Sequence, residues 1–384
     1  MWIGSEVGYK TKALGLKWPV SSIKCLGVLC NVSLEAAIEE NFTAKLKDLR
    51  CVLNMWSQRN LSLKGRVAVL RSIALPQMIY ISSVMYIPEW VIKEVNDLMF
   101  RFLWSNKKAH VRREVIIQEI SKGGLKMPDF SIIAKAIKCT WIKRLLHFSK
   151  CKQELVRNFI YYHNIGMTLE ELIYSKLDTK YLKIYSPFYA QILDSWYEAY
   201  CYNKPAVKDI FMMPLWHNKN ITIGEKPAYY PEWEKQGITT FADIIDVNGH
   251  ILPKCALEEK YSVSMKHMEY NCLIHAIPSE WKKSVRGKAM ENCTVSGDKS
   301  IRLNNKIKPI QKALCKEFYW EFINRNTYDP KAIKKWDKYS NVDHEEWPNF
   351  YQLPYLITRD IVLQSFQYKI LHWFFRCNYT LSRW

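Results

Sequence analysis

One stretch of the chain concentrates positive charge without any acidic side chain. The segment 56–76, WSQRNLSLKGRVAVLRSIALP, contains four cations, and no Asp or Glu occurs between Asp48 and Glu89. Aliphatic residues are interleaved with the cations, so one side of a helix formed here must be buried while the other presents the charges together. Cations held on a firm helical surface suit a phosphate backbone. We therefore predict nucleic-acid contacts from Arg59, Lys64, Arg66 and Arg71; the alternative is a basic solvent face on an ordinary helix.

A second basic cluster lies in the segment 104–114, WSNKKAHVRRE. No acidic residue occurs between Asp97 and Glu114. Two aromatic residues of this cluster, Trp104 and His110, are candidates for stacking on bases, as in single-strand binders; the alternative is core packing. If one strand lies across both clusters, Arg66 and Arg71 must be on the same side of the molecule as Lys107 and Arg112. The phosphate contacts predicted from this cluster are Lys107, Lys108, Arg112 and Arg113.

Catalytic and metal-binding patterns are weak by comparison. The tetrapeptide FADI at 241–244 is similar to the aspartate pair of polymerases, but Ile244 stands where a second carboxylate is needed to hold two metal ions. We interpret this match as a coincidence. Cys272 with His275, and His372 with Cys377, each supply two ligands where a structural zinc site needs four. We predict no catalytic residue and no metal site in this chain.

The composition points to a polyanionic partner. Of the 384 residues, 56 are Lys or Arg and 37 are Asp or Glu, which gives a net charge of +19. This excess favours RNA, DNA or an RNA–DNA hybrid over a membrane or a small-molecule substrate. Eleven cysteines without regular spacing, and an N-terminus that lacks the build of a signal peptide, favour an intracellular location in the nucleus or the cytoplasm. The charge-free stretch 72–88 is interrupted by Pro76 and serines and reads as a buried helix.

The hydrophobic pattern predicts a mainly α fold with a few short N-terminal strands. Residues 1–31 read as strands, and 34–58 as a helix whose apolar seam runs from Phe42 to Trp56. A second helical segment, 64–86, should kink or split at Pro76. A third helix should start at Glu89, after Pro88. The sequence also predicts a glycine turn at 122–129 and a helix at 130–147.

Several of these segments together resemble one known family. They are LGV at 26–28, the stretch from Trp56 to Tyr80, FLW at 102–104, GGLKMPDF at 123–130, KCTWIKRLL at 138–146 and FQYKILHWFF at 366–375. The series is similar to the region downstream of the palm in reverse transcriptases of LINE-type non-LTR retrotransposons. The resemblance extends to KPAYYPEWEKQGITTFADIIDVNGHIL and YNCLIHAIPSEWKK in the middle of the chain.

The resemblance implies an arrangement of domains. Residues 1–32 would be a remnant of the palm, with Leu26, Gly27 and Val28 similar to the primer grip. Residues 33–105 would form a thumb-like helical bundle, and 106–285 a helical post-thumb region. A linker at 286–300 would lead to a truncated C-terminal helical domain at 301–384. The catalytic aspartates and their Mg²⁺ would belong upstream of Met1, and the zinc knuckle downstream of Trp384, so this chain alone is expected to hold no cofactor.

Three hypotheses for function follow. The first is a fragment of an RNA-directed DNA polymerase that does not polymerise by itself but still binds RNA, DNA or primer–template without reading sequence. The second is an inert helical remnant whose basic residues are merely solvated. The third is a nucleic-acid-binding protein that the host has adopted. The first predicts binding that weakens steeply with salt, whereas the second predicts none.

Overall fold

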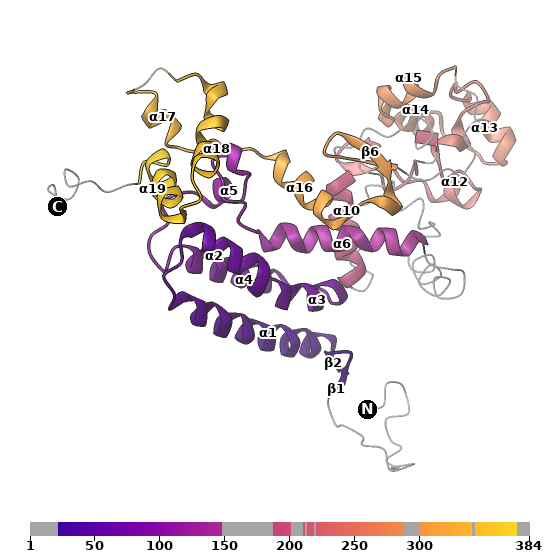
Figure 1. Ribbon diagram of the computed structural model, residues 1–384. Helices are drawn as coiled ribbons and strands as arrows, with labels where there is room; N and C mark the ends of the chain where they lie inside the picture. Colours follow the sequence, from indigo (N-terminus) through magenta and orange to yellow (C-terminus); the bar gives the residue numbers. More distant parts are fainter. Residues whose placement is uncertain are drawn as a thin grey trace, which may run out of the picture. The chain divides into compact units, whose positions relative to one another are not determined.

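The computed structural model describes residues 22–147, 187–200, 210–211, 213–218, 220–287, 300–339 and 342–374. The fold is mainly α, as predicted, and the strands form three separate two-stranded sheets (Figure 1). The chain divides into two compact units. Unit 1 comprises residues 1–134 with 322–384, and unit 2 comprises 135–321.

This division differs from the domain boundaries expected from the sequence. The expected boundary after residue 105 falls inside unit 1, and the expected linker at 286–300 falls inside unit 2, where residues 288–299 lie outside the described part. Residues 1–21 of the expected palm remnant also lie outside the described residues. Unit 1 therefore joins the predicted thumb helices to a segment that lies about two hundred residues further along the chain.

Unit 1 begins with a hairpin and a long helix. Strands β1, Ser22–Cys25, and β2, Val28–Asn31, pair antiparallel. Helix α1, Leu34–Ser57, starts at the N-cap Ser33, whose hydroxyl accepts a hydrogen bond from the amide of Ala36. The predicted seam is confirmed, because four of its members are buried in the core and Trp56 packs against it: Phe42, Leu46, Leu49 and Leu53.

Pro76 divides the next helical segment, as the sequence predicts. Helix α2, Leu63–Val69, continues into a π-helical turn, Leu70–Ala74, and then into α3, Pro76–Val84. The axes on either side of the break differ by 44°. Proline has no N–H to donate and its ring crowds the preceding turn, so the turn before it widens and Leu75 donates to the carbonyl of Leu70.

Helix α4 and the loop after it complete the core of unit 1. Helix α4, Glu89–Leu103, starts after Pro88 and buries Val91, Val95 and Met99. A short helix α5, Arg113–Ile116, and a 3₁₀ turn, Ile120–Lys122, lead into the glycine turn.

The glycine turn packs tightly against the chain. A Cβ atom at Gly124 would lie 2.1 Å from the carbonyl oxygen of Gln118, so no side chain fits there. The amide group of Gln118 exchanges two hydrogen bonds with the backbone of Tyr328, at 2.8 and 3.0 Å. Gln118, on which Gly124 packs, thus joins the late segment of unit 1 to the early one.

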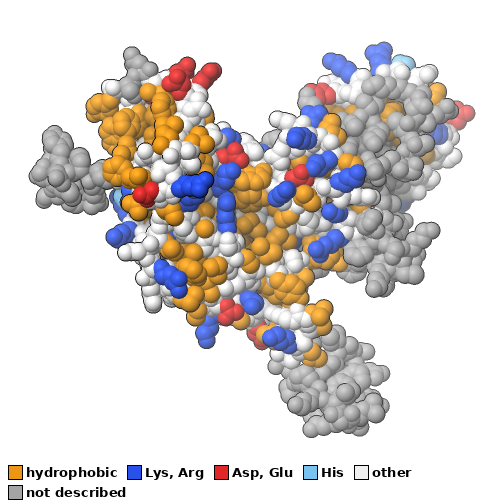
Figure 2. Space-filling model, in the orientation of Figure 1, with side chains coloured by type: hydrophobic (Ala, Val, Ile, Leu, Met, Phe, Trp, Pro, Cys, Tyr) orange, Lys and Arg blue, Asp and Glu red, His pale blue; other side chains and the backbone are white. Residues whose placement is uncertain are grey.

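Beyond the end of α16, the described part of the late segment of unit 1 contains three α-helices. They are α17, Ile333–Trp336, α18, Trp347–Ile357, and α19, Ile361–Leu371. Tyr368 of α19 donates to the carbonyl of Gly123 at 3.4 Å. Hydrophobic side chains also gather on the visible face of α18 and α19 (Figure 2). The exposed ones of these two helices include Leu353, Leu356, Ile357, Ile361, Val362 and Leu363.

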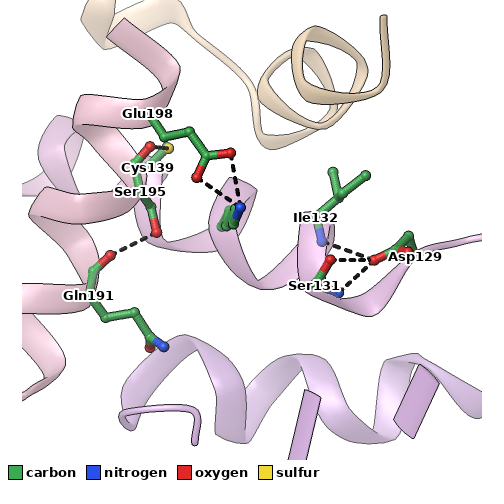
Figure 3. A network of polar contacts seen from close by, with 8 residues as sticks. Asp129, Ser131, Ile132, Cys139, Gln191, Ser195 and Glu198 are labelled. Carbon is green, nitrogen blue, oxygen red and sulfur yellow. Dashed lines mark hydrogen bonds and ion pairs between the residues drawn. The ribbon is translucent and has the colours of Figure 1, made fainter. Parts of the chain in front are cut away.

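Helix α6, Phe130–His147, matches the predicted range, and the boundary between the two units falls within it. Its start is fixed by Asp129, whose carboxylate accepts from the amides of Ser131 and Ile132 at 2.8 and 3.3 Å (Figure 3). In unit 2, α6 faces α10, Pro187–Tyr200: Lys135 pairs with Glu198 at 2.8 Å, and the thiol of Cys139 donates to the carbonyl of Ser195 (Figure 3).

The rest of unit 2 is built from short elements. These are β3, Thr222–Ile223; β4, Lys226–Pro227; α12, Pro231–Lys235; α13, Lys254–Tyr261; α14, His267–Ala276; α15, Ser279–Val285; β5, Ser300–Leu303; β6, Lys306–Pro309; and α16, Cys315–Arg325, which continues into unit 1. Buried tryptophans stabilise this unit: Trp216 packs edge to face on Trp233 and donates to the carbonyl of Ile238 at 2.6 Å.

A lysine is buried in unit 2. The side chain of Lys138 has no exposed surface, and its Nζ lies 4.0 Å from the centre of the Phe188 ring. Burial disfavours the charged form and lowers the pKa of Lys138 from 10.5 to about 7.

The core of α1 gives the first testable prediction. Leu49 is fully buried, so the substitution Leu49→Ala leaves a cavity. It should lower the free energy of unfolding by about 2 to 5 kcal/mol. Met55→Ala is a matched control on the same helix, because Met55 is half exposed, and it should cost much less. Urea unfolding monitored by circular dichroism measures both. Equal losses would contradict the position of the α1 seam.

Lys138 gives the second prediction. Between about pH 7 and 10.5 the unfolded chain holds a proton that the folded chain does not, so this group makes the free energy of unfolding rise with pH across that window. Lys138→Met removes the rise, which amounts to at most about 1.4 kcal/mol per pH unit. The measurement is urea unfolding of the parent and the variant at several pH values. The exposed Lys226 provides the control Lys226→Met, which should follow the parent; a Lys138→Met curve parallel to the parent would refute the assignment.

Candidate nucleic-acid interface

Arg66 is buried in unit 1. Its side chain is only 9% exposed, although the sequence predicts a surface cation. The guanidinium donates through Nη1 to the carbonyl of Phe102 at 2.7 Å and through Nε to the carbonyl of Leu61 at 3.2 Å. Burial lowers the pKa of Arg66, but an arginine stays charged at neutral pH. The expected open position of Arg66 is therefore not found, because its guanidinium joins α2 to the end of α4. Its contact with a phosphate stays a prediction.

Arg66 nevertheless opens on a cavity that the second basic cluster completes. The cavity, here called the Arg66 pocket, has a volume of about 470 Å³. Lys107, Lys108 and His110 line it from the loop after α4, and Lys369 lines it from α19. No Asp or Glu is among the residues that line it in the described part of the chain. The two basic clusters of the sequence therefore meet here.

The aromatic residues of this cluster are packed together. Trp104 is only 7% exposed, and its ring lies edge to face with His110 and Phe374, at 5.6 and 5.9 Å between centres. The packing alternative thus describes Trp104 in this chain, and a contact between its ring and a base stays a prediction. His110 is exposed, and its ring already stacks on Phe374 at 4.9 Å. Stacking of His110 on a base remains a prediction.

A second cavity adjoins the Arg66 pocket, because His110 lines both. This cavity has a volume of about 630 Å³ and is also lined by Arg112, Arg113 and Lys331. Arg112 is exposed. Arg113 is half buried and pairs with Asp129 at 3.1 Å, so part of its charge is neutralised. Arg112 is thus better placed than Arg113 to meet a phosphate.

The other predicted contacts lie outside both cavities. Lys64 is exposed and lies over the ring of Tyr355 at 4.7 Å, with its Nζ 3.4 Å from the side-chain oxygen of Gln364. Arg71 is exposed and donates to the carbonyl of Lys126. Arg59 is exposed and lies over the ring of Trp56 at 4.6 Å. Of the four residues expected on one side, Arg66 and Lys107 line the same cavity, Arg112 lines the adjoining one, and Arg71 has its own partner on the glycine turn. One continuous surface across all four stays a prediction.

The segment predicted to resemble a primer grip is a tight hairpin turn. Leu26 and Gly27 both have positive φ, 48° and 83°, and Leu26 is 86% exposed. Its carbonyl accepts a hydrogen bond from the hydroxyl of Tyr80 on α3 at 2.5 Å. Val28 begins the second strand and packs against the core. A role of this turn in holding a primer stays a prediction.

Local sequence reasoning missed the part of the site that comes from α19. Lys369, Ser365 and Phe374 line the Arg66 pocket but follow its other residues by more than two hundred positions. The only signal available was the stretch FQYKILHWFF, which carries Lys369 within an apolar helix. Nothing in that pattern predicts which surface the lysine joins.

The motifs set aside in the sequence have structural roles. Asp243 accepts hydrogen bonds from the amides of Thr239 and Thr240, at 2.9 and 2.7 Å, and thereby caps the 3₁₀ turn Phe241–Ile244. Within the described residues, no group of three or more His, Cys, Asp or Glu side chains is arranged to hold a metal ion. Cys377 lies outside the described residues, so its pairing with His372 is not described.

No single helix among the described residues is both long enough and apolar enough to span a bilayer. The two segments that flank Pro76, Leu63–Ala74 and Pro76–Val84, meet both requirements only when taken together across their bend.

The buried arginine gives a prediction that separates structural from surface cations. Arg66→Met removes two charge-assisted hydrogen bonds, to the carbonyls of Leu61 and Phe102, and should lower the free energy of unfolding by about 2 kcal/mol or more. Arg112→Met removes an exposed cation and should change it by less than about 0.5 kcal/mol. Chemical denaturation measures the difference. Equal effects of the two substitutions would mean that Arg66 does not hold α2 to α4.

The candidate interface is formed by residues of this single chain. Its strongest features are a buried guanidinium, a set of lysines around it and the absence of carboxylates from the lining that the structure describes. A search against models of known protein families found none that matches the chain.

Proposed function

We propose that this chain binds RNA, DNA or an RNA–DNA hybrid through the surface formed by its two basic clusters, without reading sequence. The observation that supports this most is the convergence of Arg66, Lys107, Lys108 and Lys369 on one cavity that no acidic residue lines among the described residues. Phosphate contacts of this kind position a strand but do not discriminate between bases. The net charge of +19 favours association with a polyanion over long range.

We further propose that the chain derives from the region downstream of the palm in a LINE-type reverse transcriptase. The support is the series of similar segments in the sequence together with a mainly α fold in which the helices after the β1–β2 hairpin share one core. In that parent, helices of this region would contact the backbone of the primer–template. We propose no catalytic step for this chain, because Asp243 is engaged in capping its own turn.

Two variants of equal charge test the proposal. Lys107→Gln/Lys108→Gln removes two exposed cations from the rim of the Arg66 pocket, whereas Lys47→Gln/Lys93→Gln removes two exposed lysines of α1 and α4 that do not line it. Fluorescence anisotropy with a labelled hybrid duplex at several salt concentrations measures the affinity. The slope of log K against log salt should become shallower by about 0.7 to 0.9 per lost contact in the first variant only.

Two results would contradict the proposal. A parent protein whose affinity does not change with salt makes no phosphate contacts that release counterions. Identical losses in the two double variants would mean that net charge, and not this surface, attracts the strand. Circular dichroism of each variant serves as the check that both remain folded.

A further inference from the structure

The Arg66 pocket holds a buried charge that no side chain of the described residues neutralises. Arg66 is nine-tenths buried, and its two hydrogen bonds go to neutral main-chain carbonyls. No hydrogen bond of its remaining nitrogen, Nη2, occurs within the described residues, and this atom is not among the buried unpaired ones. A buried charge without an opposite charge is costly. An anion that enters the pocket would offset that cost.

The rim of the pocket supplies further donors. Lys107, Lys108 and Lys369 make no ion pair and no side-chain hydrogen bond within the part of the chain that the structure describes. Hydroxyls of Ser105 and Ser365 also line the cavity. Ser105 and its neighbour Asn106 both have positive φ, 53° and 57°, which is unusual for residues other than glycine.

One wall of the pocket is apolar. Leu103, Trp104 and Phe374 line it together with Leu61 and Leu63. A volume of about 470 Å³ is far larger than one phosphate needs and lies within the range of sites that hold small organic ligands. The pocket thus offers cations for a phosphate and an apolar wall for the flat face of a base.

We propose that the Arg66 pocket takes the phosphorylated terminal nucleotide of a bound single strand, with the phosphate on Arg66 and the lysines and the base on the apolar wall. This inference rests on the proposed function and makes it more specific. A terminal phosphate carries close to two negative charges near neutral pH, whereas an internal phosphodiester carries one. Four cations around one cavity match the terminal group better.

The test compares three oligonucleotides of the same sequence, each with a dye on an internal base. One ends in a 5′-phosphate, one in a 3′-phosphate, and one has hydroxyls at both ends. Fluorescence anisotropy should show one of the phosphorylated strands bound about tenfold more tightly than the strand with hydroxyl ends, the effect of one charge-assisted contact. In Lys369→Gln this ratio should fall toward one. The control Lys47→Gln should keep it, because Lys47 is exposed on α1 and does not line the pocket.

The outcomes separate this inference from the function on which it rests. Salt-dependent binding of all three strands with equal affinity would overturn the terminal-nucleotide site and leave the proposed interface standing. Absence of salt-dependent binding to any strand would overturn both. Adenosine monophosphate and inorganic phosphate serve as competitors: competition by the nucleotide with no preference among the strands would assign the pocket to a free nucleotide and would also overturn the strand end as its ligand.

Discussion

The guanidinium of Arg66, bonded to the carbonyls of Leu61 and Phe102, is the interaction on which the rest of unit 1 depends. It holds the start of α2 against the end of α4 and so determines where the loop that follows α4 begins. That loop carries Lys107, Lys108 and His110 to the same cavity. The lack of Asp and Glu among the described residues that line this cavity follows from the same burial. A carboxylate nearby would pair with the buried guanidinium and cancel the charge that the cavity presents.

The sequence was sufficient for features that local chemistry determines. The seam of α1 follows from the spacing of Phe42, Leu46, Leu49 and Leu53, and the break at Pro76 follows from its missing N–H. The same local reasoning failed for Arg66 and Trp104. An arginine between aliphatic residues predicts a surface cation. Its burial is stabilised by two main-chain carbonyls, of which that of Phe102 lies on another helix and is not indicated by any local pattern. Trp104 is covered by Phe374, whose position no local pattern indicates.

The division into two units likewise depends on contacts between residues that are far apart in the sequence. The family resemblance implies a boundary after residue 105, at the end of the thumb-like bundle. The structure instead assigns residues 322–384 to unit 1. Contacts between polar groups far apart in sequence connect this segment: Gln118 with Tyr328, Lys64 with Gln364, and Gly123 with Tyr368. Amide and hydroxyl groups of this kind have no periodicity, so their pairing is visible only in three dimensions.

Gly124 packs directly against Gln118, the residue that bonds to the late segment at Tyr328. The space between this glycine and the carbonyl of Gln118 admits nothing larger than hydrogen. A methyl group here would push the Gln118 backbone aside, and the amide of Gln118 would move with it. The late helices would then lose the pair of hydrogen bonds through Tyr328, and with them the support that keeps α19 beside the Arg66 pocket. The substitution of one glycine by alanine would thus displace α19 and alter the Arg66 pocket, although Gly124 does not line that pocket.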